Sequence, residues 1–329
     1  MIAVTGATGF IGSAIVRHLL EQGEEVRVLA RPGADRRNIS GLKIEIFEGD
    51  LKNPESLFPF VKGCNGLFHV AADYRLWVRN KSELFKVNCD GTKAVILAAA
   101  AAGVSRIVYT SSVATLGTIN GGVGVEDTLV SYKDMIGAYK QSKYCAEELV
   151  RSLVINESIP IVIVNPSTPV GPRDVKPTPT GRMILEAALG KMPAYVDTGL
   201  NIVHVDDVAE GHFLAYKRGV IGARYILGGD NLTLYDVLSH IAKITGRRPP
   251  RFKIPHNLIL PFGYCVEGWA RLFRLTDPFI TVDGIKMAKK KMFFSSAKAK
   301  NELGYCPGSA NNALNDAITW LKETGQLVR

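Results

Sequence analysis

The stretch Thr5-Gly6-Ala7-Thr8-Gly9-Phe10-Ile11-Gly12 decides the fold of this chain. It follows a short β-branched run at residues 2–5 and opens a helical pattern. Gly6 permits a tight turn, Gly9 lets the backbone approach a pyrophosphate, and Gly12 lets helix and strand pack closely. The helix N-terminus faces the anion in such a unit. We therefore predict a dinucleotide site, rather than a merely structural turn, with contacts from Gly6, Thr8, Gly9, Phe10, Ile11 and Gly12.

Around this motif, the first half of the chain alternates β-branched runs with helical patterns. We predict strands over residues 2–5, 26–30, 44–47, 66–70, 106–110 and 161–164. We predict helices over residues 12–22, 54–62, 82–102 and 134–157. The strand runs are apolar on both faces, which is typical of a parallel sheet covered by helices. The fold class predicted is α/β, a Rossmann-type doubly wound parallel sheet.

The second half predicts a smaller, mostly helical C-terminal lobe that binds substrate. Residues 165–181 are rich in Pro, Thr and Gly and indicate a substrate loop on the way to it. We expect a dinucleotide-binding domain over residues 1–165, rejoined by the chain near 200–228, and a substrate lobe over 166–329. The elements predicted are a strand near 201–205, a helix from Asp206, a strand near 224–227, and helices over 233–245, 256–275, 295–303 and 310–323.

The residue after the second predicted strand bears on cofactor selectivity. An NAD-selective site usually offers a carboxylate there to the ribose 2′-hydroxyl. This chain has Arg31, with Arg36 and Arg37 nearby. Positive charge suits a 2′-phosphate, so we favour NADP(H) over NAD(H). The alternative is that these arginines face solvent.

Other strand ends supply further expected cofactor contacts. Asp50 and Leu51 follow the third strand and are expected to meet the adenine. Ala71 and Ala72 follow the fourth and are small enough to admit the cofactor, although small residues there are equally a packing choice.

Tyr139 and Lys143 lie four residues apart, on one face of a predicted helix. A phenol of pKa about 10 is a poor base at neutral pH, but a nearby ammonium stabilises the phenolate and lowers that pKa. Tyr139 can then exchange a proton with an alcohol or ketone, while Lys143 also holds the nicotinamide ribose. A hydroxyl at the end of the fifth strand positions the substrate oxygen; Ser112 is our choice and Ser111 the alternative.

Taken in order, these motifs resemble the extended short-chain dehydrogenase/reductases of the NAD-dependent epimerase/dehydratase family. The matching segments are TGATGFIG (5–12), GDL (49–51), HVAA (69–72), Asn88 with Gly91-Thr92, YTSSVATLG (109–117) and YKQSK (139–143). The resemblance implies Ser112, Tyr139 and Lys143 as catalytic residues, Asn88 as structural and Pro166 beside the nicotinamide.

Longer strings narrow the resemblance within that family. HVAADYRLW, NPSTPVGPRDVKPTPTG and KKMFFSSAKAKNELGY look most like bacterial hopanoid-associated sugar epimerases, which are similar to dihydroflavonol 4-reductases. This implies hydride transfer at a secondary alcohol or ketone carbon of a sugar, nucleotide sugar or lipid-linked substrate. Two alternatives stay open: an NADPH-dependent ketone or aldehyde reductase, and a non-catalytic dinucleotide sensor.

Residues 247–300 hold twelve Lys or Arg against three Asp or Glu, which accounts for the whole formal net charge of +9. This basic segment suits a diphosphate, an anionic lipid surface or simply solvent. Nucleic acid is disfavoured because no recognised binding module accompanies the charge. Within the segment, residues 257–275 are strongly apolar and predict either a packing helix or a peripheral membrane contact.

Localisation, oligomeric state and metal binding complete the expectations. The N-terminus shows no secretory pattern, so we expect a cytoplasmic protein, with peripheral binding at the inner face of the membrane left open. Helices 82–102 and 134–157 suggest a homodimer through the resemblance. His204-Val205-Asp206-Asp207 superficially resembles a metal cluster, but we favour Asp206 as a helix cap and expect no metal.

Overall fold

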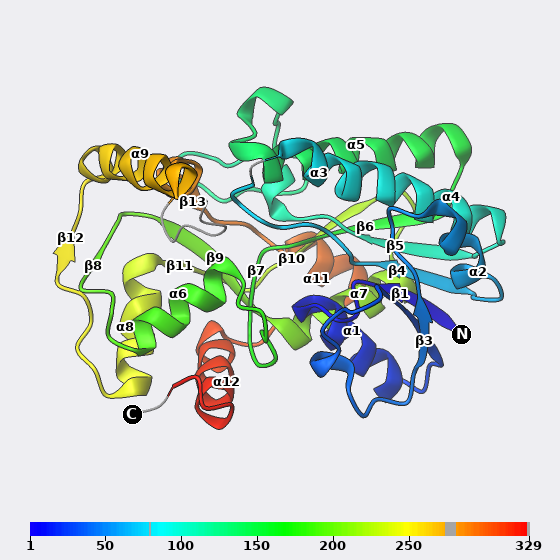
Figure 1. Ribbon diagram of the computed structural model, residues 1–329, viewed down its shortest axis with the longest axis horizontal. Coiled ribbons are helices and arrows are strands. Elements are labelled where there is room, and N and C mark those ends of the chain that lie inside the picture. Colours follow the sequence, from blue (N-terminus) through cyan, green and yellow to red (C-terminus); the bar gives the residue numbers. More distant parts are fainter. Residues whose placement is uncertain (79, 274–280, 328–329) are drawn as a thin grey trace.

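The computed structural model in Figure 1 describes residues 1–78, 80–273 and 281–327. Its larger sheet contains β1 (Ile2–Thr5), β2 (Val26–Ala30), β3 (Glu45–Glu48), β4 (Gly66–His69), β5 (Arg106–Thr110), β6 (Ile161–Pro166) and β10 (Arg224–Leu227). These strands lie in the order β10-β6-β5-β4-β1-β2-β3, and every pair is parallel. The doubly wound α/β class is confirmed. The four predicted strands at 2–5, 26–30, 106–110 and 224–227 have the bounds expected, and the others differ by one or two residues.

Alternating side chains of the strands feed two separate cores, which is why both faces of the sheet carry helices. Ile2 and Val4 pack with α1 (Phe10–Glu21), α7 (Val205–Arg218) and α11 (Ala297–Leu303). Ala3 points the other way, towards the core that includes α2 (Leu57–Val61), α4 (Thr92–Ala101) and α5 (Gly137–Glu157). Figure 1 shows α1 and α7 on one side of the strands and α4 and α5 on the other. Successive side chains of a strand point to opposite faces of the sheet, and this alternation produces the two cores.

Two predicted helices differ from the structure. Residues 82–102 are not one helix but α3 (Lys81–Phe85), a π-helical turn at Lys86–Gly91, and α4. The helix expected from Asp134 begins at Gly137, because residues Tyr132–Asp134 form a separate short turn closed by a capping box with Ser131.

The smaller part packs three helices on a mixed sheet. The sheet contains β7 (Thr168–Val170), β9 (Gly199–His204), β11 (Asp230–Thr233) and β13 (Lys291–Met292). Its core holds Ile184 of α6 (Pro179–Ala188), Val237 of α8 (Leu234–Thr245) and Leu314 of α12 (Ala310–Glu323). A two-stranded pair, β8 (Ala194–Tyr195) with β12 (Phe252–Lys253), leads to α9 (His256–Leu272) and α10 (Val282–Ala288). The last residues of the predicted helix 256–275 lie outside the described ranges.

The predicted loop at 165–181 is more regular than expected. β6 continues to Pro166, β7 follows, and α6 already begins at Pro179. The Thr178 hydroxyl caps α6 by accepting a hydrogen bond from the Gly181 amide at 3.0 Å. Proline is well suited to the first position of a helix because its missing N–H has no intrahelical partner there. The high proline content therefore does not mean that residues 165–181 lack regular structure.

The prediction that Asp206 caps α7 is wrong. His204 is the cap, because its Nδ1 accepts a hydrogen bond from the Asp206 amide at 3.0 Å. The acidic residues instead hold neighbouring segments: Asp206 is ion-paired with Arg173, and Asp207 accepts a hydrogen bond from the Gly308 amide at 2.8 Å. Among the described residues, no group of three or more His, Cys, Asp or Glu could hold a metal ion.

Candidate active site

The glycine cradle lies between β1 and β4, where the chain order of the sheet reverses. Gly6 has a φ of +73°, and a Cβ there would lie 2.7 Å from the amide nitrogen of Ala71. A Cβ on Gly12 would lie 2.1 Å from the Gly6 carbonyl oxygen. Neither position can carry a side chain, so only glycine permits this close packing of the turn at the topological switch point, where such sheets bind nucleotides.

The N-terminus of α1 is built to meet an anion. Its N-cap is Gly9, which has no side chain to cover the first amides of the helix, those of Phe10 and Ile11. Behind it, the Asn38 side chain donates a hydrogen bond to the Thr8 carbonyl at 3.2 Å. This contact folds the segment that follows β2 back on to the cradle.

That segment carries the three arginines considered for cofactor selectivity. Arg36 is ion-paired with Glu48, and Arg37 with Asp35 at 2.6 Å. The Arg31 side chain is exposed at the end of β2, and no hydrogen bond or ion pair to it is found in the described part of the chain. Arg31 is thus the arginine of the three whose guanidinium is free to meet a ligand.

The remaining expected cofactor residues also lie at the carboxyl ends of the parallel strands. Asp50 and Leu51 follow β3, Ala71 and Ala72 follow β4, and Pro166 ends β6. Leu51 is buried, and the Asp50 carboxylate accepts a hydrogen bond from the Lys52 amide at 2.9 Å. All of these residues therefore lie at the carboxyl ends of the strands, on the side of the sheet that also carries the glycine cradle.

Beneath the cradle, His69 is buried and fully hydrogen-bonded. The Thr5 hydroxyl accepts bonds from the amides of Val70 and Ala71, so its own proton goes to His69 Nδ1 at 2.7 Å. His69 Nε2 then donates to the Thr92 hydroxyl at 2.8 Å. Burial, with the nearby Lys143 ammonium, lowers the pKa of His69 to about 3. His69 is therefore a buried histidine whose two ring nitrogens both have hydrogen-bond partners.

Lys143 is buried with its ammonium held in place. Its Nζ donates to the Thr110 carbonyl at 2.8 Å and to the Tyr109 hydroxyl at 3.2 Å. Burial lowers the pKa of Lys143 to about 8, while the carboxylate of Glu147 acts in the opposite direction. A pKa near the working pH makes the charge of this lysine adjustable by its neighbours.

Tyr139 stands one helical turn before Lys143 on α5. The pKa of its phenol is raised by burial, contrary to the lowering by Lys143 that the sequence predicted, and a hydrogen bond with the Ser112 side chain opposes that rise. Ser112 follows β5 in an extended conformation, and its Oγ accepts a hydrogen bond from the Ala114 amide at 3.1 Å. The structure thus brings Ser112 together with Tyr139, whereas Ser111 is buried beside them.

Sequence reasoning missed a buried network behind Ser112. The Asn165 amide group donates to the Ser112 carbonyl at 3.0 Å and to Glu147 Oε2 at 2.8 Å. The Thr115 hydroxyl lies 2.8 Å from Glu147 Oε2, and Arg224 from β10 pairs with the same carboxylate at 3.2 Å. Glu147 follows Lys143 by four residues, so helical spacing on the Tyr139 face could have identified it.

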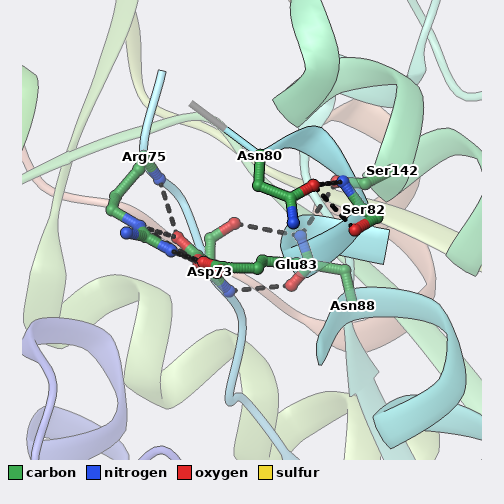
Figure 2. Close-up of polar contacts among 7 residues, drawn as sticks. All are labelled: Asp73, Arg75, Asn80, Ser82, Glu83, Asn88 and Ser142. Carbon is green, nitrogen blue, oxygen red and sulfur yellow. Dashed lines mark hydrogen bonds and ion pairs between the residues drawn. The ribbon is translucent and has the colours of Figure 1, made fainter. Parts of the chain in front are cut away.

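Asn88 joins the chain after β4 to the catalytic helix (Figure 2). Its side chain accepts a bond from the Asp73 amide at 2.7 Å and donates to the Asp73 carbonyl and to Ser142 Oγ, both at 2.9 Å. Figure 2 also shows Arg75 paired with the Asp73 carboxylate. The π-helical turn that carries Asn88 directs it at Ser142, the neighbour of Lys143. A structural role is what these contacts describe.

A cavity of about 150 Å³ lies near these catalytic candidates: Lys140, the neighbour of Tyr139, lines it, as does Ala114, whose amide bonds to Ser112 Oγ. It is lined by Ala114, Leu116, Gly117, Thr118, Leu129, Val130, Asp134, Met135, Ile136, Lys140, Met287, Lys290 and Met292. Burial and the like charge of Lys290 lower the pKa of Lys140 to about 8. The walls of the cavity thus combine apolar side chains with the ammonium groups of Lys140 and Lys290 and the carboxylate of Asp134. Gly117 and Thr118 belong to the glycine-rich run 117–124, which Gly124 ties to Phe293 by a backbone bond of 2.8 Å.

The residues present fit a dinucleotide. The side-chain-free cradle, the uncapped start of α1 and the Tyr139–Lys143 pair meet along one edge of the sheet. A bound nicotinamide would supply or accept the hydride, and Tyr139 can supply or accept the proton. Fold and site together define an oxidoreductase of the short-chain dehydrogenase/reductase type.

Comparison with known proteins names the family. The model of the NAD dependent epimerase/dehydratase family matches residues 2–228, and the chain belongs to this family of extended short-chain dehydrogenase/reductase enzymes. Its cofactor is accordingly NAD(H) or NADP(H). The chain is 45 % identical to a dihydroflavonol 4-reductase-like protein of Synechocystis sp., over 98 % of this chain and 94 % of the relative. It is 33 % identical to sterol demethylase protein B of Methylococcus capsulatus, over 98 % and 99 %.

Solved structures agree over the whole length. The crystal structure of gox2253 has 52 % identity and a TM-score of 0.90, covering 100 % of this chain and 99 % of that one. A nucleoside-diphosphate-sugar epimerase from Pseudomonas aeruginosa has 26 % identity and a TM-score of 0.81, covering 99 % of both chains.

Proposed function

We propose that this enzyme transfers a hydride between NADP(H) and a secondary alcohol or ketone carbon, with Tyr139 exchanging the proton. The observation that carries the proposal is the buried Lys143 ammonium, fixed by Thr110 and Tyr109 one turn from a phenol that is hydrogen-bonded to Ser112. An ammonium so placed stabilises phenolate, and the Ser112 hydroxyl can orient the substrate oxygen. The intact set disfavours a non-catalytic sensor.

The cofactor is NADP(H) in this proposal. Arg31 supports it, since its guanidinium is free and lies where a carboxylate would otherwise bind the ribose 2′-hydroxyl. Phosphate contacts are expected from the cradle residues named above, and adenine contacts from Asp50 and Leu51. Ala71, Ala72 and Pro166 border the nicotinamide half.

Net reduction of a ketone or aldehyde is the direction we favour. The cavity beside Tyr139 has three methionines in its wall, which suits a substrate with a bulky apolar body. Lys140 and Lys290 suit an anionic or strongly polar group on the same molecule. Relatives named for a dihydroflavonol and a sterol support such a body.

A redox-neutral epimerase of a nucleotide sugar is the second candidate. The basic segment 247–300 and the likeness to a nucleoside-diphosphate-sugar epimerase favour it. Such an enzyme oxidises a sugar hydroxyl and reduces the other face with the same bound cofactor. A role in hopanoid-related metabolism, with a sugar or lipid-linked substrate, is the expectation that the sequence resemblance adds to either candidate.

Three organisational expectations accompany the proposal. Residues 166–329 form the substrate lobe, with residues 1–165 and the return near 200–228 holding the cofactor. A homodimer through α4 and α5 stays a prediction, as does a cytoplasmic location.

Mass spectrometry of the dinucleotide released on denaturing protein purified without added cofactor tests the proposal. An empty site or trace NADP supports an exchanging NADPH reductase. Near-stoichiometric NAD would contradict the assignment of Arg31 and support the epimerase. A panel of ketones and aldehydes, assayed with NADPH, then identifies the substrate class.

A further inference from the structure

The exposed positions of α9 whose side chains the structure describes carry no charge, which is unusual for a helix at a protein surface. Its exposed positions follow helical spacing: Asn257, Leu258, Pro261, Tyr264, Cys265, Gly268 and Trp269. The large apolar side chains among them are substantially exposed, with Leu258 at 71 %, Trp269 at 61 % and the following Phe273 at 54 %. A surface helix ordinarily turns its polar side to water. This face is therefore unpartnered in the isolated chain.

The opposite side of α9 accounts for its packing on the body of the protein. A Cβ on Gly263 would lie 2.4 Å from Ile285, so α9 and α10 approach closely there. His256 Nε2 lies 2.9 Å from the Ala288 carbonyl, and the Glu267 carboxylate accepts a bond from the Val282 amide at 2.7 Å. Glu267 is the one charged residue between 257 and 270, and it is directed at α10.

Positive charge lies on the segments that flank α9 in the chain. α10 and the residues after it carry the exposed Lys286, Lys289, Lys290 and Lys291, and β12 before α9 carries Lys253 beside the exposed Phe252. Only Lys253 and Lys291 have an acidic partner among the described residues, and they share Asp197. A second copy of this chain would bring the same excess of positive charge to the face, whereas an anionic surface would complement it.

We propose that the outer face of α9 docks on an anionic lipid bilayer, with the helix along the interface and the lysines of α10 at the headgroups. Interfacial helices bind through buried apolar area together with attraction of basic residues to anionic lipid. Within residues 1–78, 80–273 and 281–327, no helix has the length and hydrophobicity needed to cross a membrane. The contact is thus peripheral.

The basic segment that begins with α10 also contributes to the wall of the cavity lined by Lys140. Met287 and Lys290 line that cavity, and Lys286 and Lys289 lie on the same short segment. Docking holds this wall of the cavity near the headgroups, where an amphiphilic substrate is concentrated. Lipid binding itself needs neither cofactor nor turnover, so it can be tested apart from the proposed reaction.

Flotation with vesicles tests the proposal on the full chain. The probes are vesicles of phosphatidylcholine with phosphatidylglycerol, and vesicles of phosphatidylcholine alone. We expect binding to the anionic vesicles that weakens as salt is raised and is much weaker on the neutral ones. The double variant Trp269→Ser/Phe273→Ser is expected to bind at least about tenfold more weakly. Ile221→Ser, at an equally exposed apolar site away from α9, is the matched control and should bind as the unmodified protein does.

A charge variant separates the two contributions. Lys286→Glu/Lys289→Glu leaves the apolar face intact and should lose most of the preference for anionic vesicles. The proposal is overturned if anionic vesicles float without protein at low salt, or if the Trp269→Ser/Phe273→Ser variant binds like the control. It is also overturned if that variant converts an oligomer to monomer in sedimentation without lipid, because the face is then an interface between copies.

Discussion

The carboxylate of Glu147 and the peptide carbonyl of Ser112 are held by one amide group, the Nδ2 of Asn165, at 2.8 and 3.0 Å. A buried carboxylate thus helps to position the segment that carries the Ser112 hydroxyl, which we propose to be catalytic. The same carboxylate raises the pKa of Lys143 against the effect of burial. Glu147 is therefore a positioning residue that also favours the charged form of the lysine.

Glu147→Gln is expected to move the alkaline limb of the kcat/KM profile to lower pH. Without the carboxylate, nothing at this position opposes the burial that lowers the pKa of Lys143, so the ammonium loses its proton earlier. Stability should fall by about 1–3 kcal/mol because Arg224 loses the buried one of its two acidic partners and keeps only the exposed Asp127. Glu148→Gln, on the exposed side of the same helix, is the control. A profile that coincides with that of the control would refute the role of Glu147.

Tyr139→Phe should lower kcat by about 10²- to 10⁴-fold while leaving dinucleotide affinity nearly unchanged, because it removes only the proton-exchanging hydroxyl. Steady-state kinetics and cofactor titration measure the two effects. Tyr132→Phe, which changes an exposed tyrosine, should have no effect. Undiminished turnover by Tyr139→Phe would remove it from the mechanism. In the same assay, Ser112→Ala should lose more activity than Ser111→Ala.

Arg31→Asp should weaken NADPH binding by about tenfold or more and leave NADH binding as strong or stronger. The substitution removes a charge-assisted contact to the 2′-phosphate and places a carboxylate where a 2′-hydroxyl can use it. Titration calorimetry with both cofactors gives the ratio. Arg37→Gln is the comparison, since Arg37 is already paired with Asp35. An unchanged ratio of the two affinities in Arg31→Asp would show that selectivity lies elsewhere.

Two buried histidines predict a loss of stability in mild acid. Burial lowers the pKa of His69 to about 3 and that of His212 to about 4, against 6.5 when unfolded. Between these values the unfolded chain binds more protons, so stability falls as pH drops below about 6.5, by about 2 kcal/mol per histidine at pH 5. Burial of Asp174 raises its pKa to about 6, which offsets part of the loss.

Urea unfolding at pH 7 and pH 5 measures this balance. The free energy of unfolding should be lower at pH 5, and the difference should grow in Asp174→Asn, which removes the offset. Stability that stays level or rises towards pH 5 would contradict the assignment of neutral histidines.

The sequence predicted the large sheet well because its signals are local and strong. Six of its seven strands are β-branched runs bounded by turn residues, and the seventh, β10, was found as a return of the chain. The short strands β7, β8, β11, β12 and β13 were missed. They hold two to four residues and form by pairing with distant segments, as when Lys291 of β13 pairs with Gly199. Length and local pattern carry no sign of such pairing.

The sequence predicted the site residues that belong to one local motif. It did not predict contacts between residues that the fold brings together from distant segments. Tyr139 and Lys143 lie four residues apart on α5, so their spacing indicated that they share one face of the helix. Glu147 lies on the same face of α5, but its hydrogen-bond partner Asn165 comes from β6. Lys140 and Lys290 meet only because α10 packs over the start of α5 near the cavity. An interaction between residues so far apart in the sequence can be seen only in the folded structure.

The pairing of β10 with β6 has a consequence for how the molecule is made. While the chain is still emerging from the ribosome, β6 is a bare sheet edge until residues 224–227 arrive to cover it. Arg224, delivered by that same strand, is also the cation that neutralises Glu147. A truncation after residue 165 would thus leave β6 as an unpaired sheet edge and would remove the guanidinium that pairs with Glu147. The surroundings of α5 are therefore completed only after residues 224–227 have been synthesised.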